Sequence, residues 1–273
     1  MKRALLALAL HTALVLAAAA TLLPLAWMVS ASLMPTGEAT ALPPRLVPST
    51  VTFAHYRDLF VRLRLARAVA NTTGLAVVVT AIALVVNALA GYAFAKLPFR
   101  GRDRLLRVLL AALVVPTQVA MLPLFLELKA LGAINTYWAV VIPGIASISG
   151  IFLVRQYALA LPDAVLDAAR VDGAGELRVF SAVALPLCAP ILTTLAVLTF
   201  LGTWNDFMWP LVVLADRDLY TLPVAVANLV GEHVQDTELI MAGAVLTVLP
   251  VIVLFVALQR YYIQGILSGG VKE

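Results

Sequence analysis

The chain has 273 residues, of which 63% are hydrophobic and only 12% are charged, and its mean hydropathy is +1.00. A soluble domain carries about twice this share of charged residues, so the composition indicates a protein that crosses a membrane several times. The apolar runs have the length of helices rather than of short alternating strands, which excludes an outer-membrane barrel. The net charge of +4 is modest and is interpreted as a topology signal, with no nucleic-acid partner.

The first predicted span covers about residues 4–29, directly after Lys2 and Arg3. A signal peptide has the same basic start but a shorter apolar region. Because this run is long enough to cross a bilayer and more spans follow, we expect an uncleaved first span. Residues 30–67 are polar and rich in proline, and we expect them to form an irregular external loop.

Five further spans are expected within a core of about residues 68–258. They are placed at about 68–95, 108–126, 137–157, 191–214 and 240–258. Pro143, Gly144 and Gly150 interrupt the fourth span, and membrane helices tolerate such breaks where neighbouring helices satisfy the freed backbone groups. A second external loop has a mildly apolar middle at 222–230, and a short tail covers 259–273. The prediction is a single all-α polytopic membrane domain over 1–273, with six transmembrane helices.

Basic residues set the expected topology. The segment 96–107 is short and strongly basic, and the positive-inside rule places it in the cytoplasm. With six spans, both termini and residues 161–190 then lie inside as well. Four arginines in the first loop oppose this assignment, but that loop is long and the 96–107 cluster outweighs them. These arginines are Arg57, Arg62, Arg64 and Arg67.

Residues 161–190 form a loop with four acidic residues and two arginines. Spans can be joined by far fewer residues, so the loop is interpreted as a docking element for a soluble partner. Pro162 and Asp163 suit the first turn of a helix, and Gly173 suits the left-handed residue that ends one. A helix is therefore predicted over 163–172.

One face of this predicted helix is a strip of small side chains, Ala164, Ala168 and Val171, at four- and three-residue spacing. On another face Asp167 can pair with Arg170. Such a helix fits closely into a groove of another protein. The alternative is an ordinary amphipathic helix on the membrane surface, which alanine side chains would hold only weakly.

The chain contains none of the common motifs for nucleotide or metal chemistry. There is no Gly-x-x-x-x-Gly-Lys-Ser/Thr and no His-Glu-x-x-His, and the three histidines are scattered. We therefore expect no catalytic residue, no metal site and no cofactor bound by this chain. The single cysteine, Cys188, excludes an intramolecular disulfide.

A few polar residues fall inside the expected spans. Asn205 and Asp206 follow Trp204 in the fifth, where an acidic side chain either lines a polar translocation path or reaches headgroup water beside an outer aromatic belt. Asn87 in the second span and Gln118 in the third face the same cavity or join helices by hydrogen bonds.

The loop sequence resembles the cytoplasmic motif of membrane subunits in binding-protein-dependent ABC importers, which reads Glu-Ala-Ala, three residues, Gly, nine residues and Ile-x-Leu-Pro. Here Asp167-Ala168-Ala169 is followed at that spacing by Gly173, Val183 and Leu185-Pro186. Asp replaces Glu and Val replaces Ile. Residues 92–102, 162–174 and 204–207 and the terminal Gly269-Gly270-Val271-Lys272 are similar to the carbohydrate-importer branch of this family.

The resemblance implies a sugar permease of the bacterial cytoplasmic (inner) membrane. It implies as partners a second, different permease, a dimer of ATP-binding subunits that uses ATP and Mg²⁺, and an extracellular solute-binding protein. The helix in the loop is implied to be a coupling helix seated in the ATP-binding subunit, and the tail residues Gly269, Gly270 and Lys272 are implied to make a second contact. The implied coupling residues are Asp167, Ala168, Ala169, Arg170, Asp172, Gly173, Ala174, Leu185 and Pro186.

Three alternatives to this interpretation exist. The same machinery can carry another polar solute, such as a glycerol phosphate. A self-contained secondary transporter predicts inverted repeats and ionisable residues at the midplane, whereas the sequence shows no repeat and few charges within the spans. A membrane-anchored structural protein would not need the loop at 161–190.

Overall fold

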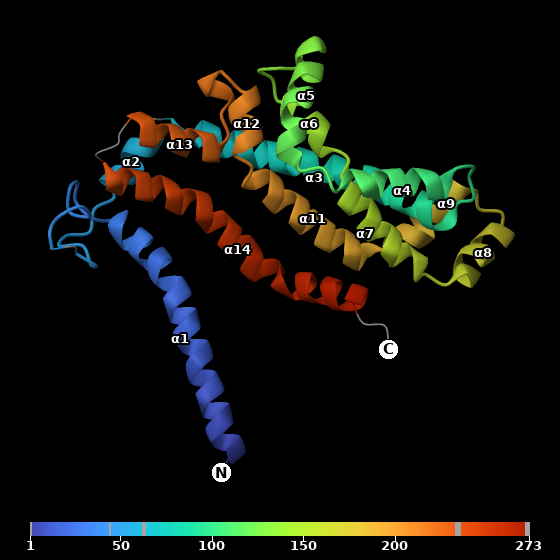
Figure 1. Ribbon diagram of the computed structural model, residues 1–273, viewed down its shortest axis with the longest axis horizontal. Helices are drawn as coiled ribbons and strands as arrows, with labels where there is room; N and C mark the ends of the chain where they lie inside the picture. The colour runs from blue at the N-terminus through green and yellow to red at the C-terminus, as the bar shows by residue number, and fades with distance from the viewer. Residues whose placement is uncertain (1, 44, 62–63, 233–235, 271–273) are drawn as a thin grey trace. The chain divides into compact units, whose positions relative to one another are not determined.

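The computed structural model describes residues 2–43, 45–61, 64–232 and 236–270, and its secondary structure is helical (Figure 1). Four described segments are long and apolar enough to cross a membrane: Leu5–Ala31, Leu65–Lys96, Trp138–Leu159 and Thr237–Ala257. Two bent pairs of helices bring the number to as many as six if each pair is one span. The prediction of an all-α membrane protein is confirmed, with six spans as the upper bound.

The chain divides into two compact units. The first contains Met1–Arg67 and Leu222–Ile252, and the second contains Ala68–Thr221 and Val253–Glu273. The first unit holds α1 (Lys2–Ala31), α2 (Ala54–Val61), α13 (Leu222–Glu232) and the first part of α14 (Thr237–Gly270). No residue in the apolar window of α1 is buried, and a helix that is apolar all round and uncovered by protein is stable in hydrocarbon rather than in water.

The first loop is more ordered than its prolines suggest, so the expectation of an irregular segment at 30–67 is corrected. Residues 54–61 form α2, because His55 and Leu59 lie four residues apart and are both buried. The His55 ring contacts the Met34 carbonyl oxygen through Nε2 at 2.9 Å. Glu238, in the first turn of α14, is completely buried, and its Oε1 accepts the Ala39 N–H at 2.7 Å.

Most of α3 (Leu65–Lys96) belongs to the second unit, where it packs against α6 (Trp138–Gly144) and α7 (Ile148–Leu159). Two glycines permit the close approach. A Cβ atom on Gly91 of α3 would lie 2.7 Å from the Val154 side chain, and one on Gly144 would lie 2.7 Å from Val79. Small residues at such crossings let membrane helices pack backbone to backbone.

The expected third span at 108–126 is wrong as a single straight helix. The structure has α4 (Arg102–Ala112) and α5 (Thr117–Ala130), which meet at an angle of 106°. Pro116 lies at the break. Proline has no N–H for the helix ladder and disfavours helical geometry at the preceding residue, so the first helix ends before it.

The expected fifth span at 191–214 is also divided. Before it lie three short helical segments, α9 (Glu176–Val179), the π-helix η1 (Phe180–Ala184) and α10 (Leu185–Leu187). A bend of 78° separates these segments from α11 (Ala189–Trp204). After residues 205–207 the short α12 (Met208–Val213) begins. The Asn205 side chain donates to the Leu201 carbonyl at 2.9 Å and the Asp206 Oδ1 accepts the Trp209 N–H at 3.4 Å, so these polar side chains end one helix and begin the next.

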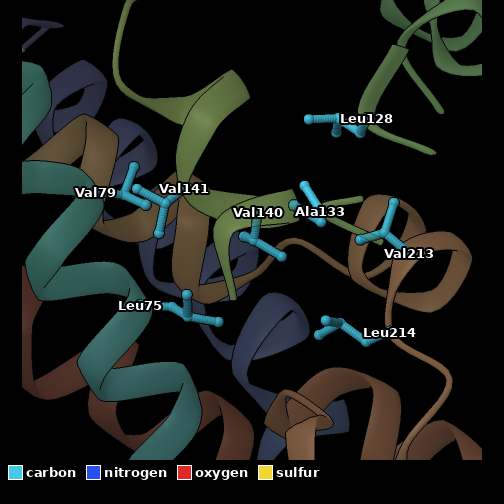
Figure 2. Close-up of a cluster of buried hydrophobic side chains, with 9 residues drawn as sticks. Leu75, Val79, Leu128, Ala133, Val140, Val141, Val213 and Leu214 are labelled. Atoms are coloured by element: carbon cyan, nitrogen blue, oxygen red, sulfur yellow. The ribbon is translucent and has the colours of Figure 1, made fainter. Parts of the chain in front are cut away.

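A buried apolar cluster joins α3, α6, α12 and the end of α5 (Figure 2). Its buried members are Leu75, Val79, Leu128, Ala133, Ala139, Val140, Val141, Val213 and Leu214. The Asn135 Oδ1 accepts the backbone N–H groups of Ala215 and Asp216, each at 2.9 Å. This cluster holds the helices that surround the cavity described below.

The last helix is longer than predicted. α14 runs from Thr237 to Gly270, whereas a span at about 240–258 and a separate tail were expected. Of the tail residues singled out in the sequence, Gly269 and Gly270 lie in the last turn of this helix, and Lys272 lies outside the described residues. The loop expected between the last two spans contains α13 over its apolar middle, and the 3₁₀ turn η2 (Arg217–Leu219) precedes it.

Candidate functional site

The helix predicted in the 161–190 loop is present as α8 (Asp163–Val171), beside α9 and η1 at one end of the second unit (Figure 1). Gly173 follows it with φ +85°. The Gly173 N–H donates to the Arg170 carbonyl and the Ala174 N–H to the Ala169 carbonyl, both at 3.0 Å. This pair of bonds is a Schellman motif, which requires the left-handed conformation that glycine adopts without strain.

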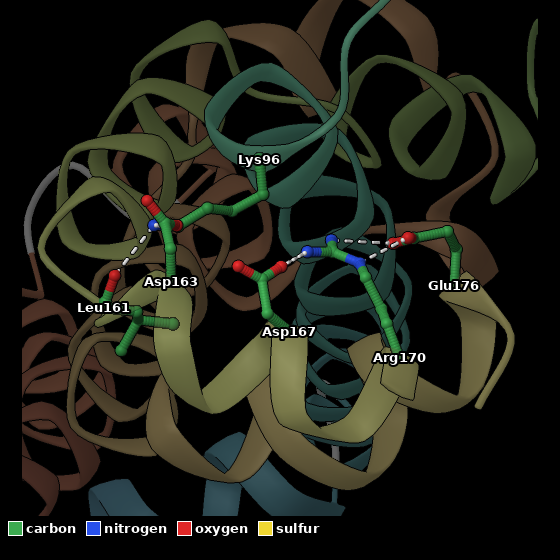
Figure 3. Close-up of polar contacts among 6 residues, drawn as sticks. All are labelled: Lys96, Leu161, Asp163, Asp167, Arg170 and Glu176. Atoms are coloured by element: carbon green, nitrogen blue, oxygen red, sulfur yellow. Dashed lines mark hydrogen bonds and ion pairs between the residues drawn. The ribbon is translucent and has the colours of Figure 1, made fainter. Parts of the chain in front are cut away.

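Arg170 connects α8 to the segment that follows it (Figure 3). Its Nη1 donates to the Asp167 Oδ1 at 2.7 Å, which confirms the predicted pair, and its Nε and Nη2 donate to the two Glu176 carboxylate oxygens at 2.7 and 3.2 Å. The hydrogen bonds to Glu176, which have the larger effect, and to Asp167 raise the pKa of Arg170, so the guanidinium stays charged. The two-point contact with Glu176 fixes the direction of the chain after Gly173.

Lys96, the last residue of α3, ties this span to the start of α8. Its Nζ donates to the Leu161 carbonyl at 2.8 Å and to the Asp163 Oδ1 at 2.6 Å (Figure 3). The Lys96 side chain is only 7% exposed, whereas that of Asp163 is 75% exposed. Sequence reasoning missed this contact because the partners are 65 and 67 residues apart.

The inner face of the loop packs on an apolar cluster. Leu166 of α8 is completely buried, with Tyr92 of α3 and Val179 and Ala184 of the following helices. Partly buried residues around them include two positions of the sequence motif, Ala169 and Val183, and also Ala174, which follows Gly173. These motif positions therefore hold the loop against α3.

The opposite face of α8 is open. Ala164 and Ala168 are exposed and Val171 is 87% exposed, so the strip of small side chains is available to a partner. The remaining predicted coupling residues divide by burial: Asp167, Asp172, Gly173 and Pro186 are exposed, while Ala169, Arg170, Ala174 and Leu185 are half-buried.

The ion pair at the start of α8 predicts a specific pH dependence. The hydrogen bond from Lys96 lowers the pKa of Asp163 below its ordinary value. The pair's contribution to stability is therefore complete above the ordinary value of about 3.9 and is lost as the pH falls through the lower, folded value. Between about pH 5 and pH 3, we expect the Tm of the wild type to fall faster than that of Asp163→Asn. Identical slopes over this interval, in thermal unfolding of the detergent-solubilised chain, would contradict the pairing.

A cavity of about 580 Å³ lies in the same unit, where helices are broken. It contains three of the four polar residues predicted for a translocation path: Gln118 at the start of α5, and Asn205 and Asp206 between α11 and α12. Pro143 and Gly144, at the end of α6, form another part of its wall. Aromatic side chains contribute as well: Phe207 and Trp209 line the cavity, and the Trp209 Nε1 is held by the Ala139 carbonyl at 2.8 Å.

The fourth residue, Asn87, is elsewhere. It is completely buried, and its Oδ1 accepts the Ser147 N–H at 3.0 Å, at the break between α6 and α7. A Cβ on Gly150 would lie 3.0 Å from the Asn87 Nδ2, so this glycine leaves room for the amide. Asn87 therefore satisfies a backbone group freed by the break in the fourth apolar segment, which is an interhelical contact rather than a cavity wall.

Replacing Asn87 by leucine is expected to destabilise the chain by about 1–3 kcal/mol, because the half-buried Ser147 N–H would lose its acceptor. The control is Asn228→Leu, since among the residues that the structure describes the Asn228 side chain bonds within its own helix, to the Val224 carbonyl. The measurement is the half-life at elevated temperature of each variant in detergent. An equal effect of the two substitutions would show that the bond to Ser147 has no special role.

Residues 87–268 match the family described as "Binding-protein-dependent transport system inner membrane component". This region contains the whole 161–190 loop and both broken helices. The chain belongs to this family. Family membership confirms the resemblance seen in the loop motif, and the protein is therefore a permease subunit of the inner membrane.

Named relatives match the permease over most of its length. It is 37% identical to the arabinooligosaccharides transport system permease protein AraQ of Halalkalibacterium halodurans, over 91% of this chain and 90% of that protein. It is 33% identical to the lactose transport system permease protein LacG of Rhizobium radiobacter (96% and 95%) and 36% identical to the trehalose transport system permease protein SugB of Mycobacterium tuberculosis (92% and 92%).

One solved structure has the same fold as the permease. It is described as a bacterial ABC transporter involved in the import of the acidic polysaccharide alginate. The TM-score is 0.86 at 23% sequence identity, and the match covers 96% of this chain and 98% of that chain. At this identity the likeness establishes the fold.

Proposed function

We propose that the permease is one membrane-spanning half of an ATP-driven importer for sugars or oligosaccharides, which an extracellular solute-binding protein delivers. The observation that carries this proposal is α8, a short helix that exposes one face and is fixed on the other to a span. In the proposed assembly the bent pairs count as spans, giving six, and 1–273 is a single translocating domain. Both termini and the 161–190 loop as far as Gly175 lie in the cytoplasm, and α9 to α10 begin the crossing that α11 completes.

In this proposal α8 docks into an ATP-binding subunit through Ala164, Ala168 and Val171, with Asp167 and Asp172 at the edge of the contact. ATP and Mg²⁺ bind to a pair of such subunits, and this chain supplies no catalytic residue. Closure of the pair moves α8. Lys96 joins α8 to α3 and Arg170 joins it to the segment leading into α11, so a displacement of α8 reaches two spans as rigid-body motion.

The last turn of α14 is the second proposed contact with the ATP-binding subunits, through Gly269 and Gly270. Small residues at the end of a long helix permit close approach of another backbone. Lys272, which continues the same segment in sequence, is assigned to this contact by its motif alone.

The 580 Å³ cavity is proposed to be this subunit's part of the translocation path, completed by a second, different permease. Carboxylate and amide groups at Asp206, Asn205 and Gln118 can bond sugar hydroxyls, and the ring of Trp209 can contact the apolar face of a sugar. Among the lining residues that the structure describes there is no lysine, arginine or histidine. This half of the path therefore suits a neutral sugar better than a glycerol phosphate.

The decisive experiment reconstitutes the assembled importer in proteoliposomes with its binding protein outside and ATP inside. The solutes to compare are arabinotriose, lactose, trehalose and glycerol 3-phosphate. ATP-dependent uptake of a neutral sugar, reduced by Asp206→Asn, is the expected result. Uptake by this chain without an ATP-binding subunit would instead establish a secondary transporter, and ATP-dependent uptake of glycerol 3-phosphate alone would reject the sugar assignment.

A further inference from the structure

An open hollow of about 790 Å³ lies along the segment that joins α3 to α4 and the first turns of α4. It plays no part in the proposed transport cycle. Its wall is a short segment that contains four arginines, Arg100, Arg102, Arg104 and Arg107, and a single acidic residue, Asp103. We propose that it binds the headgroup phosphate of an anionic phospholipid. Guanidinium groups bind phosphate oxygens through paired N–H donors, and several of them around one hollow form a site for such a group.

The segment that lines this open hollow is fixed in place. Gly101, with φ +82°, turns the chain between the two helices, and the ring of Phe99 packs on that of Phe94 with centroids 5.6 Å apart. Leu106 of α4 is buried against Phe94 and Ile151. The segment is therefore held to the body of the second unit, and its arginines lie along one open, basic surface.

Two of the arginines are available for a ligand. Arg102 contacts Asp103 at 3.3 Å, and the Arg107 Nε donates to the Asp103 carbonyl at 3.3 Å. Arg100 and Arg104 are exposed and have no ion-pair partner among the residues that the structure describes. These two side chains are the expected phosphate ligands.

Position and neighbouring side chains favour a lipid over a soluble anion or a protein. The cavity begins two residues after Lys96, the end of a 32-residue apolar helix, which places it at the depth of lipid headgroups. Leu105 and Val108 lie next to Arg104 on α4 and are 48% and 61% exposed. Basic and exposed apolar side chains on adjacent faces match a phosphate joined to acyl chains.

The test uses the assembled importer in a neutral detergent, titrated with dioctanoyl phosphatidylglycerol and followed by thermal shift. Dioctanoyl phosphatidylcholine tests the acyl chains alone and inorganic phosphate tests the free anion. We expect saturable stabilisation by phosphatidylglycerol only. Arg100→Gln with Arg104→Gln is expected to weaken the apparent affinity about 25-fold, at about fivefold per arginine. The matched control, Arg57→Gln with Arg64→Gln, removes the same charge before α3 and is expected to change it less than about twofold.

Several outcomes would overturn the site. Stabilisation by phosphatidylcholine equal to that by phosphatidylglycerol would show that the acyl chains alone are bound. Equal stabilisation by inorganic phosphate would show that the site binds a free anion. An equal loss of affinity for phosphatidylglycerol in both double variants would show that the lipid is attracted by the overall positive charge and not by this site. Loss of the co-purifying ATP-binding subunit in the Arg100/Arg104 variant, with unchanged lipid affinity, would reassign the surface to a protein contact. The wild-type lipid comparison needs no variant, so the test stands even if the double variant misfolds.

Discussion

Gly173→Val is expected to abolish ATP-driven import while leaving the amount of permease in the membrane unchanged. Gly173 has φ +85°, and its Cβ position is open, with no atom within 4 Å. The cost of a side chain there comes from the backbone, at about 1–2 kcal/mol for a left-handed residue and more for a β-branched one. Relief of that strain breaks the Schellman bonds and moves Glu176 away from Arg170, which changes the shape of the proposed docking face.

Gly132 provides a matched control. It has φ +68° and open space at its Cβ position, and it ends α5 with the same two bonds, from Gly132 N–H to the Lys129 carbonyl and from Ala133 N–H to the Leu128 carbonyl. Gly132→Val should lower the Tm comparably yet retain import, and Gly173→Asn should retain it too, because asparagine tolerates the left-handed region. The readouts are membrane content, binding-protein-stimulated ATP hydrolysis and uptake. Full ATP coupling in Gly173→Val would remove the docking role from α8.

Lys96→Met is expected to reduce import at least about tenfold, because two hydrogen bonds are lost together, one from α3 to the first residue of α8 and one to Leu161 just before it. The half-buried contact with the Leu161 carbonyl and the pair with Asp163 both depend on the Lys96 Nζ. Loss of a charged donor to such groups costs about 1.5–3 kcal/mol. Asp163→Asn should have a much smaller effect, because Asp163 is mostly exposed and an exposed pair contributes about 0–1 kcal/mol.

Comparing further variants shows whether import depends on the contacts of Lys96 with Leu161 and Asp163 or only on its positive charge. Lys129→Met removes the same charge from an exposed position near the end of α5 and should leave uptake unchanged. Lys96→Arg should retain a large part of it, because arginine keeps the charge and the donors. Disulfide trapping between cysteines introduced in α8 and in the ATP-binding subunit would report whether docking itself persists. If Asp163→Asn is as damaging as Lys96→Met, the carbonyl contact has no role.

Local signals in the sequence were sufficient for the centre of the candidate site. Pro162 and Gly173 mark the ends of α8, and three-residue spacing predicts the Asp167–Arg170 pair, because both depend on neighbours along one helix. The all-helical membrane class follows from composition. Proline and glycine at 143 and 144 likewise indicated where the fourth apolar segment breaks.

What the sequence could not provide depends on contacts between distant segments. Lys96 looks like any basic residue after a span, and its partners are fixed only when α3 and α8 pack together. Glu176 lies beyond the end of α8, so no helical spacing connects it with Arg170. The predicted spans also continued through Pro116 and through Asn205-Asp206, because a hydropathy average over a window reports apolar content and not the direction of the chain. The bends that shape the cavity were missed for this reason.

The bond between Ala39 and Glu238 has a consequence for biosynthesis. The two residues are 199 positions apart, so the ribosome must extend the chain by that many residues after Ala39 before the partner of the Ala39 N–H exists. Until the first turn of α14 is made, the segment between α1 and α2 lacks this contact, and we expect proteases to cleave the segment faster. Trypsin can cleave this segment at Arg45, so the time at which the segment becomes resistant to trypsin would report when membrane insertion is complete.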